Sequence, residues 1–141
     1  MKQFLLIACG ILAIVATCRS QKVNIPAPVT NAFNAKYPNA TAVKWGKESA
    51  KEYEAEFKLN GANVSANFDL DGSWIETETT IPSSGLPAAV ISAVNIKYPG
   101  AVYFLTERIE KPGGKTLYEV NIKVKGKKKE LELDGDGNLA E

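Results

Sequence analysis

An internal repeat constrains this sequence more than any other feature. Residues 25–40 read IPAPVTNAFNAKYPNA, and residues 86–101 read LPAAVISAVNIKYPGA. The residues shared at an offset of 61 positions, numbered in the first copy, include Pro26, Val29, Ala32, Asn34, Lys36, Tyr37 and Pro38. A unit of about 60 residues is too long for one turn of a solenoid and long enough for a helix and several strands. The chain is therefore predicted to contain two copies of one small unit.

The later part of each unit repeats at a longer offset. Tyr53 recurs as Tyr118, 65 positions later, and the FDLDG sequence of residues 68–72 recurs as LDGDG in residues 133–137. A longer loop in the second copy, EKPGGK, accommodates the extra residues. We therefore expect the two copies at about residues 25–80 and 86–141.

The first twenty residues have the features of an export signal. Lys2 gives a short basic start, and residues 4–16 form an apolar stretch that is too short to span a bilayer once it is cleaved. We expect residues 1–20 to be a signal peptide and residues 21–141 to be the mature domain. Cleavage after Ser20 would release a soluble periplasmic or secreted protein. Lipoprotein processing before Cys18 would instead anchor the domain to a membrane.

The mature chain contains neither cysteine nor histidine. Cys9 and Cys18 lie in or beside the signal, and the whole sequence has no histidine. No Ser-His or Cys-His nucleophile can therefore be assembled, and no cofactor is predicted. The seventeen Lys and Arg residues nearly balance the sixteen Asp and Glu residues, so charge gives no case for nucleic acid as a partner. We expect a protein that is not an enzyme.

Each copy is predicted to begin with a short helix and to continue as an antiparallel meander. Pro26 and Pro87 stand at the helix starts, and Pro38 and Pro99 prevent the helices from extending past the preceding tyrosines. Apolar and charged residues alternate in EYEAEFKL, residues 52–59, as in a strand with one buried face. In the first copy the pattern predicts strands at about 42–48, 52–59, 62–68 and 73–80. The predicted class is α+β, with the helices on one sheet face and the other face open to water.

The combined motifs resemble a known family. The order of LP or IP, a short helix, KYP, YEAEF or YEV, NG and FDxDGxW is similar to that of the PepSY-like family of small exported bacterial domains, also described as beta-lactamase-inhibitor-like. The resemblance covers about residues 25–141, and both copies carry it. It implies a tandem helix-plus-meander fold whose two sheets continue into one saddle-shaped surface. It also implies a non-enzymatic role in binding or inhibiting another exported protein, and it supplies no catalytic residues.

Trp74 is the first candidate for a partner-binding residue. Alternation in SWIETETT puts Trp74 on the same face as Glu76 and Glu78, which predicts a tryptophan exposed among carboxylates on the open sheet face. Exposed aromatic residues ringed by polar groups are typical binding anchors. The alternative is that Trp74, beside the Asp71-Gly72 turn, bends over the sheet edge and closes the core.

The same alternation predicts a charged docking surface on the open face. Charges of both signs along this face would steer a protein partner, although a solvated sheet face has the same pattern. The predicted partner-binding residues besides Trp74 are Glu54, Glu56, Lys58, Ser65, Asn67, Glu76, Glu119, Asn121 and Lys123.

Aspartates in the turns suggest a small-ligand or calcium-binding periplasmic protein as the alternative function. Asp134, Asp136 and Asn138 stand at alternate positions, as at the start of an EF-hand loop, but the glutamate that completes such a loop is missing. A hairpin turn built on Asp-Gly explains the same residues, and no metal site is predicted. The primary hypothesis is an exported protein-binding module that inhibits or regulates another exported protein, such as a peptidase or hydrolase. No membrane partner is expected unless Cys18 is lipidated.

Overall fold

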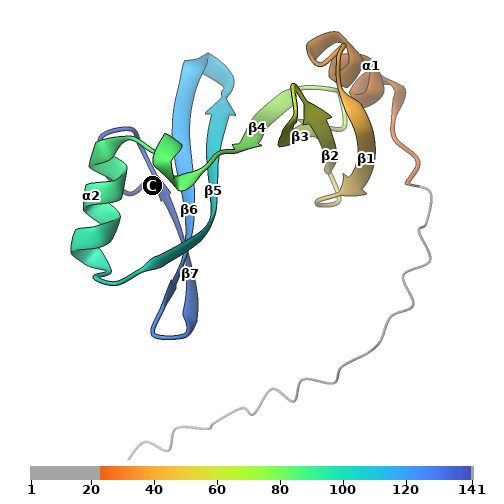
Figure 1. The fold of residues 1–141 in the computed structure, drawn as a ribbon. Helices are drawn as coiled ribbons and strands as arrows, with labels where there is room; N and C mark the ends of the chain where they lie inside the picture. Colours follow the sequence, from red (N-terminus) through yellow and green to blue (C-terminus); the bar gives the residue numbers. More distant parts are fainter. Residues whose placement is uncertain (1–22, 141) are drawn as a thin grey trace, which may run out of the picture.

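The computed structural model describes residues 23–140, which form two helices and one seven-stranded antiparallel sheet (Figure 1). The predicted signal peptide and both cysteines lie outside the described residues. Helix α1 (Ala27–Lys36) is followed by strands β1 (Thr41–Lys47), β2 (Glu52–Leu59), β3 (Ala62–Asp69) and β4 (Trp74–Thr80). Helix α2 (Ala88–Lys97) is followed by β5 (Val102–Lys111), β6 (Lys115–Val124) and β7 (Lys127–Leu133). The predicted α+β class is confirmed.

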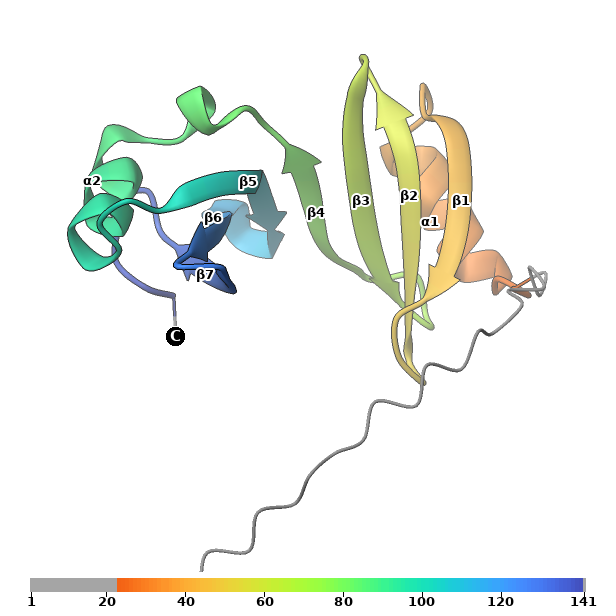
Figure 2. The same ribbon diagram turned by 60° about the horizontal axis from the view of Figure 1, so that its bottom comes forward.

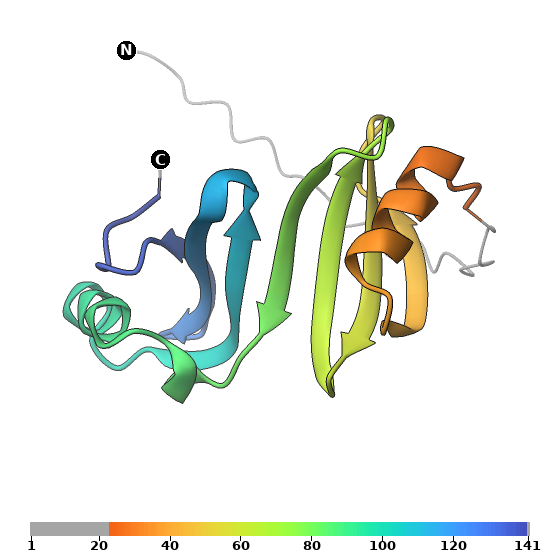
Figure 3. The same ribbon diagram turned by 90° about the horizontal axis from the view of Figure 1, so that it is seen from above.

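The strands lie in the sheet in the order of the chain, from β1 to β7, and every neighbouring pair is antiparallel. Figures 2 and 3 show the strands side by side, with α1 and α2 near opposite ends of the sheet. Strands β4 and β5 pair only over residues 77–80 and 107–110, which makes this junction the shortest ladder in the sheet. Short 3-10 turns at Ser83–Gly85 and Pro112–Gly114 precede α2 and β6.

The helix boundaries follow from the prolines. Pro26 and Pro87 lie directly before α1 and α2, where a missing N–H group costs nothing. At the other end, the N–H groups of Tyr37 and Tyr98 each donate a hydrogen bond of 2.8 Å to the carbonyl four residues earlier. The prolines that come next cannot extend the helix, because they lack an N–H group and clash with the preceding turn.

Two hydrophobic clusters lie between the helices and the sheet. Both helices cover the same sheet face, because the register aligns Ala66 with Thr77, Thr77 with Glu110, and Glu110 with Thr116. The cluster under α1 consists of Val29, Phe33, Tyr37, Tyr53, Ala55, Phe57, Val64, Ala66 and Phe68. The cluster under α2 consists of Leu86, Val90, Val94, Val120, Ile122, Leu131 and Leu133. The helical members of the clusters, Val29 and Phe33 in α1 and Val90 and Val94 in α2, stand four residues apart and therefore share one face of their helix.

One turn in each half of the sheet touches the start of the helix above it. Gly72 and Gly137 have φ angles of +88° and +85° and therefore adopt the left-handed region. A Cβ atom would lie 2.6 Å from the carbonyl oxygen of Pro28 at Gly72, and 2.6 Å from that of Ala89 at Gly137. Glycine is therefore required at both positions, on conformational and on steric grounds.

Candidate docking surface on the open sheet face

The open face is the side of the sheet opposite the two helices. Cross-strand register defines it: Glu54 pairs with Asn67, which pairs with Glu76, and one step further along Glu56 pairs with Ser65. These side chains alternate with the core residues of the same strands. The open face is therefore built from the polar positions of the strands.

Nine of the ten predicted partner-binding residues lie on the open face, which agrees with the alternation seen in the sequence. They come from β2, β3, β4 and β6, and they are Glu54, Glu56, Lys58, Ser65, Asn67, Glu76, Glu119, Asn121 and Lys123. Their role in binding remains a prediction.

The expectation that the whole open face is wet is wrong at two positions. Ile109 and Leu117 are cross-strand partners on this face, yet only 1% and 2% of their surfaces are exposed. Ile109 also pairs with Glu78 on the neighbouring strand. A small apolar centre therefore lies on the open face, next to the carboxylate of Glu78.

The prediction that Trp74 points out of the open face is also wrong. Phe68 pairs with Trp74, whereas Asn67 pairs with Glu76, so one extra residue is inserted into β4 at this point. This β-bulge reverses the alternation, because two residues of one strand oppose one residue of the other. Trp74 therefore shares the helix-covered face with Phe68 and packs against the α1 cluster. Its alternative interpretation, as a residue that closes the core, agrees with this position.

Polar contacts fix Trp74 in place. Its Nε1 donates a hydrogen bond of 2.9 Å to Oγ1 of Thr77, and the same hydroxyl is hydrogen-bonded to the hydroxyl of Tyr37. Lys36 Nζ lies 3.5 Å from the centre of the indole ring, within cation–π range. Burial raises the pKa of Tyr37 above its ordinary value, which keeps its hydroxyl protonated and able to donate. The group holds the end of α1 to the sheet.

Four carboxylates gather at the middle of the open face. Glu78 has Glu107, Glu76 and Glu119 as its charged neighbours, and Ser65 Oγ donates a hydrogen bond of 3.2 Å to its carboxylate. Burial, followed by repulsion from these neighbours, raises the pKa of Glu78 to about 7. Burial likewise raises the pKa of Glu119. The centre of the face therefore carries excess negative charge.

A single lysine bridges the face at one side of this carboxylate group. Lys111 Nζ lies 3.2 Å from Oε2 of Glu76 on β4 and 3.7 Å from Oε1 of Glu132 on β7. Burial disfavours the charged amine, but its hydrogen bonds and the charges of the two glutamates outweigh burial and raise the pKa of Lys111. Among residues 23–140 the open-face glutamates Glu54, Glu56, Glu78, Glu107 and Glu119 make no ion pair within 4.0 Å.

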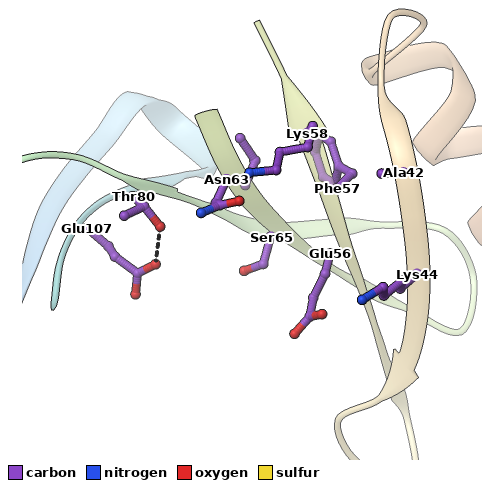
Figure 4. Close-up of a pocket in the computed structure, with 10 residues that line it drawn as sticks. Ala42, Lys44, Glu56, Phe57, Lys58, Asn63, Ser65, Thr80 and Glu107 are labelled. Carbon is purple, nitrogen blue, oxygen red and sulfur yellow. Dashed lines mark hydrogen bonds between the residues drawn. The ribbon is translucent and has the colours of Figure 1, made fainter. Parts of the chain in front are cut away.

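A hollow of about 360 Å³ lies on the open face and extends from β1 to β5. Figure 4 shows Glu56, Ser65 and Glu107 pointing to the same side of the sheet, with Lys44 on β1 and with Lys58 extending from β2 toward Asn63. Thr80 donates a hydrogen bond of 3.1 Å to Oε1 of Glu107, which joins β4 to β5 at the edge of the hollow.

A second hollow, of about 190 Å³, shares Thr80 with the first. Its lining is more apolar and includes Ile81, Pro82, Phe104 and Leu105. Phe104 and Leu105 are 49% and 36% exposed. The two hollows therefore share Thr80 at the β4–β5 junction; charged residues line the first, whereas the lining of the second combines apolar residues with uncharged polar ones.

Sequence reasoning missed Glu78 and Glu107 as members of the site. Glu78 was placed on the open face by alternation but was not selected as a partner-binding residue. Glu107 joins the site only because β4 pairs with β5 and aligns Thr80 with Glu107. That long-range pairing has no local signature, although the excess of glutamate in strands of both copies was visible.

In the turn of residues 134–138, the aspartate carboxylate accepts hydrogen bonds from groups of the same turn. Asp134 Oδ1 accepts bonds of 3.0 Å and 2.9 Å from the backbone N–H groups of Asp136 and Asn138. The side-chain amide of Asn138, followed by these backbone bonds, holds the pKa of Asp134 below its ordinary value. Within residues 23–140, no group of three or more acidic, histidine or cysteine side chains is arranged to hold a metal ion. In the same range no helix has the length and apolar character needed to cross a membrane.

Comparison with protein families gives one match. The family model described as "Putative beta-lactamase-inhibitor-like, PepSY-like" matches residues 17–64 and, a second time, residues 51–141. No curated protein matches the chain.

Several solved structures are similar to this chain. A BLIP-like protein from Bacteroides fragilis is 30% identical, with a TM-score of 0.71 over 84% of this chain and 85% of the other. A DUF2874 family protein from Bacteroides ovatus is 24% identical, with a TM-score of 0.74 over 84% and 86% of the two chains. A protein from Bacteroides eggerthii, described as periplasmic, is 21% identical, with a TM-score of 0.74 over 84% and 88%.

Proposed function

Because this chain belongs to the PepSY-like family, which is described as beta-lactamase-inhibitor-like, we propose that it is an exported, non-enzymatic module that binds another exported protein through its open sheet face. The observation that carries the proposal is the open face itself. It is charged and hollowed, and no helix of residues 23–140 covers it. Complementary charges on such a surface steer a protein partner and fix its orientation.

The chemistry of the open face favours binding over catalysis. Glu78 has a raised pKa, as some catalytic acids do, but its neighbours are other carboxylates and a serine hydroxyl. Acid–base catalysis by two carboxylates needs one that keeps its proton and one that is ionised. Different surroundings in an enclosed site separate their pKa values in this way. The hollow that Glu107 lines next to this group is instead partly open to solvent. We therefore assign the open face to protein docking.

Export is part of the proposal. The basic start and the apolar stretch of residues 4–16 are the features of a secretory signal. The similar protein from Bacteroides eggerthii is described as periplasmic, which supports the same compartment for this chain. We propose that residues 1–20 are removed and that residues 21–141 act in the periplasm or outside the cell.

We also propose that residues 25–80 and 86–141 are two copies of one unit. The family model matches twice, and the residues shared at offsets of 61 and 65 positions support an ancestral duplication. The contacts of Gly72 with Pro28 and of Gly137 with Ala89 are equivalent under these offsets. A single surface formed by both copies would explain why the open face runs across the whole sheet.

The test of the proposed function is affinity capture from exported proteins of the source bacterium with the mature chain as bait. A Glu54→Lys/Glu119→Lys variant reverses charge on the open face. An Asp136→Lys variant is the matched control, because Asp136 lies in an exposed turn away from that face. Circular dichroism melting of each variant establishes that it is folded.

We expect one protein to be retained by the wild type and by Asp136→Lys and to be lost from the open-face variant. The captured protein is then purified and titrated against the bait by calorimetry. A partner that binds all three baits equally would overturn the use of the open face. A failure of any protein to bind saturably would overturn the binding function and favour the small-ligand alternative.

A further inference from the structure

Strands β4 and β5 meet in a groove formed by the two adjoining hollows. Thr80 lines both hollows, and its hydroxyl is hydrogen-bonded to the carboxylate of Glu107 on the neighbouring strand. On one side the lining contains Glu56, Ser65 and Glu107. On the other side it contains Phe104 and Leu105. We use the term junction groove for these two hollows together.

The charged hollow of the junction groove contains Lys44 and Lys58 toward its β1 end, but its β4–β5 end has carboxylates without an ion-pair partner. Glu107 lies beside Glu78 and Glu119, and within residues 23–140 none of these three carboxylates has an ion-pair partner within 4.0 Å. Lys111 shows how such charge is compensated on this face, because its one amine bridges Glu76 and Glu132. The groove would gain in the same way from an ammonium or guanidinium group, which favours ionised carboxylates.

The apolar side of the junction groove is exposed by a second β-bulge. The register between β5 and β6 shifts between Tyr103 and Leu105, which leaves Phe104 between paired residues and 49% exposed. Its ring is not part of either hydrophobic cluster. Lys128 Nζ lies 5.2 Å from the ring centre, so a cation already rests against one side of the phenyl group.

From this arrangement we propose that the junction groove receives a loop of the partner protein in which a lysine or arginine stands next to an apolar side chain. The basic group lies at Glu107, which lines the groove and has Glu78 and Glu119 as its charged neighbours, and the apolar group packs on Phe104 and Leu105. The inference rests on the proposed function and specifies the partner's chemistry. Charge complementarity favours a basic residue in the loop. The adjoining hollow favours an apolar side chain next to that basic residue.

A protein loop fits the junction groove better than a free small molecule does. Small-molecule sites enclose most of the ligand surface between mainly apolar walls. Here the larger hollow is lined mainly by polar and charged side chains of five strands and is partly open to solvent. A loop brings its own backbone and neighbouring side chains to cover such a site, so that water is excluded around the ion pair.

The test uses a defined probe, a displayed library of disulfide-closed peptide loops, selected on the immobilised mature chain. Each enriched loop is synthesised, and its affinity is measured for the wild type and for two groove variants, Glu107→Gln and Phe104→Ser. Glu110→Gln is the control for the charge change, because Glu110 is on the helix-covered face of the same strand. Ile96→Ser is the control for the apolar change, because Ile96 is 79% exposed on α2.

We expect the enriched loops to share a basic residue next to an apolar one. Their affinity is expected to fall about tenfold or more in each groove variant, and by less than about twofold in each control, as for loss of a central interface contact. Raising the salt concentration should weaken binding to the wild type more than binding to Glu107→Gln.

Three results would overturn the inference, and they separate it from the proposed function. Loops without a basic residue, or loops that bind Glu107→Gln and Phe104→Ser as well as the wild type, overturn the groove assignment. If those loops lose affinity for a Glu54→Lys variant, which changes the open face outside the groove lining, the open face still binds proteins and only the groove assignment fails. If no open-face variant affects any selected loop, the groove assignment and the proposed function both fail.

Discussion

Glu78 is the residue whose ionisation is most affected by the fold. Its carboxyl group is partly buried beside Ile109, with three other glutamates as its charged neighbours. Its pKa is about 7 in the folded protein, whereas an unfolded chain gives the ordinary value of 4.5. Between these two values the folded state binds more protons than the unfolded state. The free energy of unfolding therefore decreases as the pH rises through this window.

A Glu78→Gln substitution should remove this pH dependence. At pH 8 the wild type carries a charged Glu78 that burial and repulsion disfavour, so the variant is expected to melt at a higher temperature, by on the order of 3 °C. At pH 4 Glu78 is protonated in both states, and the two proteins should melt at nearly the same temperature. Scanning calorimetry from pH 4 to pH 8 measures the difference.

The matched control for this prediction is Glu110→Gln, which removes a glutamate from the opposite sheet face. The pKa of Glu119 is raised as well, so part of the wild-type pH dependence should persist in Glu78→Gln. A melting difference between Glu78→Gln and the wild type that is the same at pH 4 and pH 8 would contradict the assignment of the buried charge to Glu78.

At Trp74 a single inserted residue reverses which face of the sheet the side chain occupies. Strict alternation would place its indole on the open face, but the bulge turns it toward Phe68 and α1. Its ring then contacts the amine of Lys36, and its N–H group reaches Thr77. Trp74 is therefore expected to contribute to stability and not to partner binding.

Replacing Trp74 by alanine should lower the free energy of unfolding by roughly 2–3 kcal/mol, because the indole is only partly buried and the full range applies to enclosed aromatic residues. Leu70→Ala, in the same turn, is the control, because Leu70 is 42% exposed and should change stability by less than about 0.5 kcal/mol. Urea unfolding followed by circular dichroism gives both values. Equal stability of the two variants would show that the indole does not hold α1 to the sheet.

At the scale of elements, the turn after β3 and the turn after β7 fix the helices above them. Gly72 and Gly137 combine a left-handed backbone with a close approach to a helix carbonyl. Gly61 has a similar φ angle of +85°, but nothing lies within 4 Å of the position that a Cβ atom would take. Substitutions at the three glycines can therefore distinguish the cost of a left-handed backbone from the cost of steric overlap with a helix.

Gly72→Ala and Gly137→Ala are each expected to destabilise the protein by roughly 2–4 kcal/mol, the sum of a left-handed penalty and of overpacking against the helix. Gly61→Ala should cost only the left-handed penalty, about 1–2 kcal/mol. Urea titration of the three variants ranks them. A Gly61→Ala variant as unstable as the other two would show that contact with the helix adds nothing.

Most elements could be predicted from the sequence because their signals are local. The prolines set the limits of both helices, and alternation located β2 and β3 to within one residue. The bulges could not be predicted, because a bulge is decided by how two strands pair and not by the residues of one. Trp74 was therefore assigned to the wrong face. Val43 lies where the register of β1 shifts and is 38% exposed, although strict alternation would put it on the same face as Trp45.

The candidate site was predictable only in part for a related reason. Glu54, Glu56 and Ser65 follow from alternation within single strands. The groove, however, depends on the order β4–β5 and on a register that aligns Thr80 with Glu107. Pairing between residues that are far apart in sequence carries no periodic signal, so neither the groove nor its apolar side was visible beforehand.

For the whole molecule, the shortness of the β4–β5 ladder determines how the two halves depend on each other. The ladder spans residues 77–80 and 107–110, and the two hydrophobic clusters have no residue in common. Across the junction, the Lys111–Glu76 ion pair and the bond from Thr80 to Glu107 add a few polar contacts. Partly exposed polar contacts contribute little to stability, so each cluster should open largely on its own.

Amide hydrogen exchange of Gly137→Ala tests this independence. The substitution disturbs the turn that touches α2, so amides of β6 and β7 should exchange about tenfold faster or more, as a loss of about 1.4 kcal/mol or more in local stability requires. Amides of β2 and β3 should keep wild-type protection, and Gly72→Ala should give the reverse pattern. Equal acceleration in both halves would mean that four paired residues and the open-face contacts join the clusters into one cooperative unit. Charge on the open face would then affect the stability of both halves, and partner binding there would protect the whole sheet from exchange.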